Sequence, residues 1–172
     1  MRQSIPYSRA RPGSDFRAKQ RYMPEEETIE RAREDEREGK SPSTQAGEFV
    51  REEMEHVREG KHGARSTKQA IAIGLSKARR AGVKLPPPKK GRVSSRTRKQ
   101  AARDTSKGRS RKRRKPSATR SRAVRKALKG EPRSAASRRA LSRQARSAAR
   151  SRSKADRSRA ARKAARTRKR NR

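Results

Sequence analysis

The chain has 172 residues, of which 26% are hydrophobic and 42% are charged. Ordering each residue costs about 1 to 2 kcal/mol of backbone entropy, so a chain this poor in apolar side chains cannot bury enough surface to form one large core. The net charge of +38 opposes compaction and favours a polyanionic partner.

The charge is divided unevenly along the chain. Residues 1–88 carry 19 basic and 14 acidic side chains, a net charge of +5, whereas residues 89–172 carry 36 basic and 3 acidic ones, a net charge of +33. Three prolines at 86–88 form a semi-rigid spacer between the halves. We therefore expect a mostly α-helical and disordered protein, with a small helical hairpin and a long basic, conditionally helical tail.

The first forty residues lack a regular apolar pattern. The aromatic side chains in residues 1–22 follow no helical or strand period, which predicts a disordered arm. Residues 23–40 predict a charged helix, because Pro24 stands at a first-turn position, several acids lie near the N-terminus and Gly39 follows the end. This helix has almost no apolar face, so we expect it to be solvated; the alternative is an acidic mask that competes with nucleic acid for the tail.

Residues 46–85 carry the signals of a helical hairpin domain. A first helix is predicted up to Gly60, and a second after Ser66, where the S-x-x-Q pattern of a capping box begins. Gly82 ends the second helix, and the residues after it can fold back on the hairpin. The apolar stripes on the two helices match in size. We expect them to form the hairpin's own core, with self-association as the other reading, through Phe49, Val50, Met54, Val57, Ile71 and Leu75.

The second helix also carries a recognisable motif. Residues 68–82 read KQAIAIGLSKARRAG, and Glu48, Phe49, Met54 and the Glu59-Gly60-Lys61 turn precede them. This segment resembles a small, uncharacterised bacterial domain family of short basic proteins, with the recurring helix KQAIAI-x-LS-x-AR-x-AG. The resemblance implies a bacterial source and supplies no mechanism.

Residues 86–172 form a tail dominated by Arg, Lys, Ala and Ser. Ala and Arg favour helix, so charge repulsion opposes helix formation until a phosphate backbone relieves it. Pro116, Gly130 and Pro132 divide the tail into possible helices at about 117–129 and 133–165. The tail resembles the basic C-terminal tails of linker histones and of bacterial histone-like proteins, although it is richer in Arg and no winged-helix domain precedes it.

We expect these tail cations to bind the phosphate backbone of DNA. Duplex DNA carries one charge per about 1.7 Å, so a net charge of +33 matches roughly 16 base pairs. Ser hydroxyls add neutral donors to phosphate, and contacts of this kind do not read base sequence. The predicted nucleic-acid-binding residues are Arg109, Arg111, Lys112, Arg113, Arg114, Lys115, Arg120, Arg122, Arg125, Lys126, Arg138, Arg139, Arg143, Arg146, Arg150, Arg157, Arg162, Lys163, Arg166, Arg168, Lys169 and Arg170.

Residues typical of catalysis or metal binding are sparse. Glu52, His56 and Glu59 share a helix face, yet the second histidine of a zinc-binding helix motif is missing, so we expect no metal and no cofactor. His62 reads as a polar loop residue or a phosphate contact. The absence of cysteine rules out disulfides and thiolate metal sites. No nucleophile–base arrangement, phosphate loop or buried carboxylate site is evident, which argues against an enzyme.

These observations predict a histone-like, nucleoid-associated protein that coats or condenses DNA without sequence preference. Binding to RNA or ribosomes is an alternative, weakened by the 2% aromatic content. The other alternative is a protein-interaction module that the tail tethers to the nucleoid. We expect a cytoplasmic location and no membrane contact, because no apolar run suits a signal peptide or a membrane span.

Overall fold

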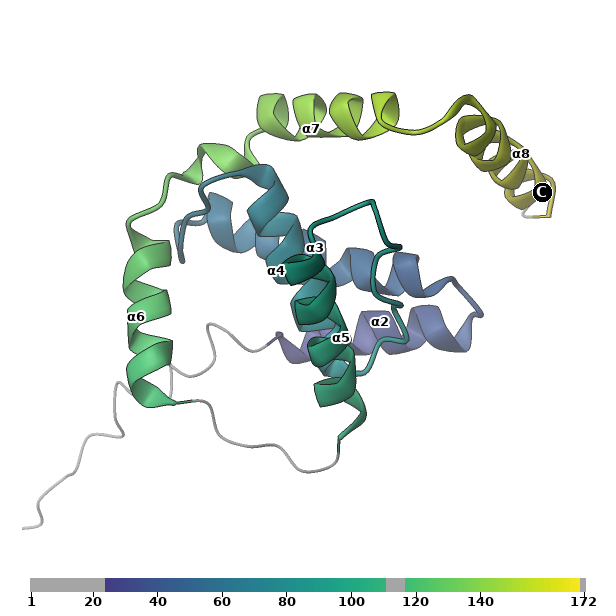
Figure 1. Ribbon diagram of the computed structural model, residues 1–172. Coiled ribbons are helices and arrows are strands. Elements are labelled where there is room, and N and C mark those ends of the chain that lie inside the picture. Colours follow the sequence, from purple (N-terminus) through teal and green to yellow (C-terminus); the bar gives the residue numbers. More distant parts are fainter. Residues whose placement is uncertain (1–23, 111–116, 171–172) are drawn as a thin grey trace, which may run out of the picture.

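The computed structural model describes residues 24–110 and 117–170, apart from the side chain of Arg170. The arm expected at residues 1–22 lies outside the described residues. Within these ranges the chain forms seven α-helices and one short 3₁₀ helix, and it contains no strand (Figure 1). The helical class expected from the sequence is confirmed for this part of the chain.

The expected hairpin is the centre of a larger bundle. Helices α3 (Pro42–Arg58) and α4 (Thr67–Ala81) pack against each other, α2 (Glu26–Arg37) packs on α3, and α5 (Ser95–Arg109) packs on α4 (Figure 1). The prediction of a two-helix domain at 46–85 is therefore wrong as a description of the folded unit. Two helices alone would leave the outer faces of α3 and α4 exposed, and α2 and α5 cover them.

The ends of α4 form as the sequence predicts. The Ser66 hydroxyl accepts a hydrogen bond from the Gln69 backbone N–H at 3.2 Å, and the Gln69 side chain accepts one from the N–H of Arg65 at 2.9 Å. Gly82 ends the helix at φ +107°, in the left-handed region that favours glycine. Val83 and Leu85 then fold back against the bundle, which confirms that expectation.

Two small cores hold the bundle together. The core between α2, α3 and α4 contains Phe49 and three alanines, and the core at the other end of α3 contains Met54, Val57 and four alanines. The residues considered for self-association belong to these cores. Phe49, Met54 and Val57 are buried, and Val50, Ile71 and Leu75 are partly buried against them. The expectation that this stripe forms the protein's own core agrees with this burial, and self-association through it stays a prediction.

Helix α2 is not solvated on all sides. Thr28 and Ala32 are buried against the bundle, and Ile29 packs on the same core as Phe49. Some of its acids pair with cations of the first half of the chain, as Asp35 does with Lys40 at 2.8 Å and Glu36 with Lys84 at 3.1 Å. These contacts use α2 as a layer of the bundle and leave the mask for the tail without support.

The basic half of the chain is not one uniform tail. Besides α5, the 3₁₀ helix η1 (Arg133–Ala136) enters the fold, because Ala135 and Ala136 lie in the core with Met54 and Val57. Helices α6 (Ala118–Lys129), α7 (Arg138–Arg150) and α8 (Lys154–Arg170) frame the bundle (Figure 1). The helix predicted at 117–129 is confirmed, the one predicted at 133–165 is broken into three pieces, and α5 was missed.

Backbone and side-chain hydrogen bonds attach residues 128–136 to the bundle. The Gly63 N–H donates to the Leu128 carbonyl at 2.8 Å, and the Ala64 N–H donates to the Pro132 carbonyl at 3.1 Å. The Thr67 hydroxyl donates to the Ala135 carbonyl at 2.6 Å. Residues more than sixty positions apart thus share one fold. These contacts fix the end of α6 and the start of α7 on the bundle.

Candidate nucleic-acid interface

Helix α7 presents its cations outward because its few apolar residues lie on one stripe. Leu141 packs against the core beside η1, and Ala140, Gln144 and Ala148 on the same stripe are half-buried. The opposite face is exposed and carries five of the predicted phosphate contacts. These exposed residues are Arg138, Arg139, Arg143, Arg146 and Arg150.

Helix α8 is exposed along its whole described length, and only the Asp156 side chain is half-buried. The Ser153 hydroxyl caps the helix by accepting from the Asp156 N–H at 3.1 Å. Asp156 pairs with Arg159 at 2.7 Å and with Arg92 at 3.0 Å, which joins α8 to the segment before α5. The Ser153 hydrogen bond, together with Arg159 and Arg92, lowers the pKa of Asp156 to about 2. The predicted residues Arg157, Arg162, Lys163, Arg166, Arg168 and Lys169 are all exposed here.

The remaining predicted residues lie on other elements. Arg109 is exposed at the end of α5, and Arg120, Arg122 and Lys126 are exposed on α6. Arg125 is half-buried and donates to the Ser121 carbonyl at 3.3 Å. Arg170 belongs to α8, and the predicted run Arg111, Lys112, Arg113, Arg114 and Lys115 lies outside the described residues.

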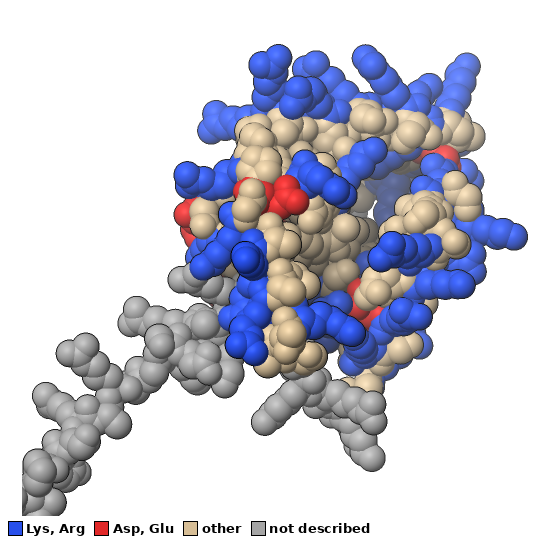
Figure 2. All heavy atoms as spheres, turned by 60° about the vertical axis from the view of Figure 1, so that its left-hand side comes forward, with Lys and Arg blue, Asp and Glu red and all other residues tan. Residues whose placement is uncertain are grey.

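Most of the basic side chains of the second half cannot be neutralised within that half. Residues 89–172 contain three acids for 36 cations, and one of these acids, Asp104, is fully buried between α4 and α5. Asp104 accepts hydrogen bonds from Ser76 at 2.9 Å and from Arg80 at 2.7 Å. Figure 2 shows the consequence: Lys and Arg side chains project around the periphery of this face, and acidic atoms form only small patches.

Two basic hollows on the bundle were missed in the sequence. An open groove of about 390 Å³ lies between the start of α4 and α7, where Arg65 and Lys68 face Arg143. A second hollow of about 380 Å³ follows α5 beside Arg96, Lys99 and Arg103. Arg65 and Lys68 lie far from the tail in the sequence, and α5 was not expected as a helix, so neither surface had a local signal.

A cluster of buried charges lies inside the bundle, on α3 and α4. Glu52 and Glu53 are 2% and 0% exposed, and the Lys77 ammonium lies 2.9 Å and 2.8 Å from their carboxylates. Burial lowers the pKa of Lys77, but the two carboxylates outweigh it and raise that pKa above its ordinary value. Burial likewise raises the pKa of Glu53, and His62 and Lys77 reverse this to lower it. The expectation that the chain holds no buried carboxylate site is wrong.

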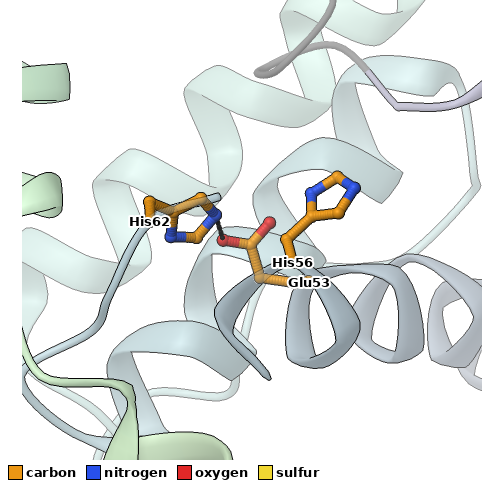
Figure 3. Close-up of side chains that lie close together, drawn as sticks. All are labelled: Glu53, His56 and His62. Atoms are coloured by element: carbon orange, nitrogen blue, oxygen red, sulfur yellow. Dashed lines mark ion pairs between the residues drawn. The ribbon is translucent and has the colours of Figure 1, made fainter. Parts of the chain in front are cut away.

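Both histidines of the chain adjoin this cluster (Figure 3). His62 is 4% exposed, and its Nε2 atom lies 3.1 Å from Glu53 Oε1; His56 is 3% exposed, and its Nε2 atom lies 2.9 Å from Glu25 Oε1. Contact with Glu53 raises the pKa of His62. His62 lies in the loop as expected, but it is buried against Glu53, so its interpretation as a phosphate contact is corrected. His56 does have a second histidine nearby, one supplied by the loop and not by the helix.

Comparison with known proteins identifies a family over part of the chain. Residues 37–90, which contain α3 and α4, match a family of unknown function (DUF6496). The expected resemblance to an uncharacterised small domain family is confirmed at that level, while α5 to α8 lie beyond the match. No curated protein and no solved structure matches the chain. Among the described helices, none combines the length and the apolar character needed to cross a membrane.

Proposed function

We propose that this protein binds duplex DNA through its phosphate backbone, without sequence preference, as a histone-like and nucleoid-associated protein. The observation that carries the proposal is the exposed array of cations on α7 and α8, in a half of the chain that holds three acids for 36 cations. Such an array has a high affinity for polyanions, because each phosphate contact releases condensed counterions.

The arrangement of the helices supports backbone contacts over base reading. Cations lie on most of the exposed circumference of α8, so several of them reach phosphates in most orientations of the helix on the duplex. Helix α7 offers a one-sided row, and the groove containing Arg65, Lys68 and Arg143 continues that row onto the bundle. The bundle then serves to hold α7 in place. The low aromatic content of 2% favours duplex DNA over single-stranded RNA, whose recognition depends on base stacking.

The test is a salt titration of binding to duplex DNA and to structured RNA of equal length and scrambled sequence. A chain that ends at Arg152 lacks ten cations. Among the described residues, the ion pair of Asp156 with Arg92 joins α8 to the rest of the fold. Removing these cations flattens the dependence of log affinity on log salt, by up to about 9 if each contacts phosphate. The bundle keeps its unfolding transition.

The matched control is a full-length chain with Lys40→Gln and Lys84→Gln. These two cations are already paired with Asp35 and Glu36, so their loss leaves the salt dependence unchanged. A preference for RNA at physiological salt would replace DNA by RNA in the proposal. A salt dependence equal in the full and shortened chains would remove α8 from the interface.

A further inference from the structure

The chain contains two histidines and no cysteine, and both histidines lie in the interior of the bundle. Their ring centroids are 6.2 Å apart, and the Glu53 carboxylate lies between the rings (Figure 3). One nitrogen of each ring and one Glu53 oxygen all lie within 4.8 Å of one another. Two imidazoles and a carboxylate at this separation form a ligand set known from zinc proteins.

The hydrogen bonds of His56 leave one ring nitrogen directed into this cluster. Its Nε2 atom lies 2.9 Å from Glu25 Oε1, and since a carboxylate only accepts, this nitrogen carries the proton. In the neutral ring, the Nδ1 atom is then a lone-pair acceptor. It is fully buried and has no hydrogen-bond partner, and Glu52 Oε1 is 3.8 Å away. An acceptor buried in this way has lost its hydrogen bonds to water and gained no partner, which costs free energy. A bound cation would supply the missing partner.

His62 is oriented in the complementary way. Its Nδ1 atom lies 3.0 Å from the Gly63 carbonyl oxygen, to which only a protonated nitrogen can donate. Its Nε2 atom points to Glu53 Oε1 at 3.1 Å. Each ring thus uses one N–H on an outer acceptor and turns the other nitrogen toward Glu53. Outer acceptors fix metal-binding histidines in the same manner.

We propose that Glu53, His56 and His62 bind one divalent transition-metal ion, with Zn²⁺ as the fitting ion. Nitrogen ligands select Zn²⁺ over Mg²⁺ and Ca²⁺, which prefer oxygen. Zinc–ligand bonds of 2.0 to 2.2 Å place tetrahedral ligand atoms about 3.4 Å apart. His62 Nε2 and Glu53 Oε1 are already 3.1 Å apart, so it is chiefly His56 that moves inward, by about 1 Å, on binding. The ion takes the place of the proton between His62 Nε2 and Glu53, while Lys77 keeps Glu52 as its counterion.

The proposed site ties the loop after α3 to the start of α2. Glu25 lies just before α2, Glu53 and His56 are on α3, and His62 is on the loop to α4. A bound ion would therefore join α3 and the loop directly, and Glu25 would link the segment before α2 to the site through His56. The site lies apart from α7 and α8, so it is tested without nucleic acid, and it stands or falls independently of DNA binding.

The first measurement is Zn²⁺ binding to the full chain after chelator treatment, followed by calorimetry and by ¹⁵N chemical shifts of the histidine rings. We expect one ion per chain, with shifts at His56 Nδ1 and His62 Nε2 and a higher midpoint of thermal unfolding. Mg²⁺ at the same concentration produces none of these changes. Absence of Zn²⁺ binding, or shifts at the other ring nitrogens, would overturn the proposal and leave an ion-pair network.

A second measurement avoids the risk that removing a buried ligand unfolds the bundle. Glu25 is half-exposed and orients His56, so Glu25→Ala preserves the fold and weakens Zn²⁺ binding by about 10- to 100-fold, the usual effect of losing an outer acceptor. The matched control is Glu26→Ala at the next position, which leaves the affinity unchanged. Equal affinities in the two variants would contradict the assignment of His56 Nδ1 as a ligand.

Discussion

The bundle and the two C-terminal helices use the same basic residues for different purposes. In the bundle, Lys77 is 7% exposed and lies between two buried carboxylates. In α7 and α8 the described arginines are exposed, and the second half of the chain holds only three acids for its 36 cations. The number of acids within reach, and not the residue type, decides whether a cation stabilises this fold or remains available to a polyanion.

The largest expected effect comes from removing the counterion in the bundle. Lys77→Met leaves Glu52 and Glu53 buried without their ammonium partner. Breaking a buried ion pair in this way lowers the free energy of unfolding by about 3 to 5 kcal/mol, enough to unfold a marginal bundle. Denaturant unfolding of the metal-free chain, followed by circular dichroism, measures the change.

The control for this variant is Lys68→Met on the same helix. Lys68 is exposed beside the groove, so its replacement changes the free energy of unfolding by less than about 0.5 kcal/mol. Under the proposed function, Lys68→Met weakens DNA binding more than Lys77→Met does, because Lys68 faces solvent and Lys77 does not. Similar stabilities for the two variants would mean that the buried network contributes nothing to the fold.

The contact between Gly63 in the bundle and Glu131, in the segment that leads to α7, gives the next largest effect. A Cβ atom at Gly63 would lie 1.7 Å from the Glu131 carbonyl oxygen, so Gly63→Ala forces residues 128–132 away from the bundle. We expect a loss of about 1 to 3 kcal/mol in the free energy of unfolding, the usual range for overpacking. Hydrogen exchange of the Gly63 and Ala64 amides locates the loss at this contact.

Gly47→Ala is the matched control for this contact. Gly47 lies in α3, where an added Cβ meets nothing within 4 Å, so alanine stabilises the helix by about 0.4 to 1 kcal/mol. The two glycine variants therefore shift the unfolding midpoint in opposite directions. A loss of stability in both would show that the close approach at Gly63 is not the cause.

The central helices were predictable because their signals are local. Ser66, Gln69 and Gly82 mark the ends of α4 within one turn of each end, and the apolar stripes identified the core faces. The bundle was not predictable, because its other layers join largely through alanines and polar residues. Ala135 and Ala136 resemble the other alanines of the tail, and only the fold shows them packed against Met54 and Val57.

The candidate sites divide in the same way. The exposure of the tail cations follows from composition, since so few acids are present to pair with them. The groove between α4 and α7 and the Glu53, His56 and His62 cluster depend on long-range packing. A usable signal for the cluster was present, because both histidines of the chain lie within ten residues of Glu53. Histidines that served only as exposed polar residues would not need to lie so close together in the sequence.

The smallest effect is expected at Asp156, and Asp104, in the other region of the basic half, provides the comparison. Asp104→Asn and Asp156→Asn each remove one negative charge, so net charge alone predicts identical behaviour. Asp104 is fully buried and accepts from Ser76, Arg80 and Gln100, so its replacement weakens charge-assisted hydrogen bonds and lowers the free energy of unfolding by about 1.5 to 3 kcal/mol. Urea unfolding of the two variants measures this difference.

Asp156→Asn leaves the unfolding of the bundle unchanged, because Asp156 lies on exposed α8 and binds cations that solvent also reaches. The pKa of about 2 keeps this carboxylate ionised at neutral pH. Its ion pairs with Arg92 and Arg159 therefore stabilise the attachment of α8 at pH values above the unfolded pKa of about 3.9, and this stabilisation is lost as the pH falls through about 2. The substitution releases Arg92 and Arg159 at neutral pH, which steepens the salt dependence of DNA binding by about 1 to 2. If Asp156→Asn instead destabilised the bundle as much as Asp104→Asn, α8 would be part of the folded unit and not an arm for phosphate.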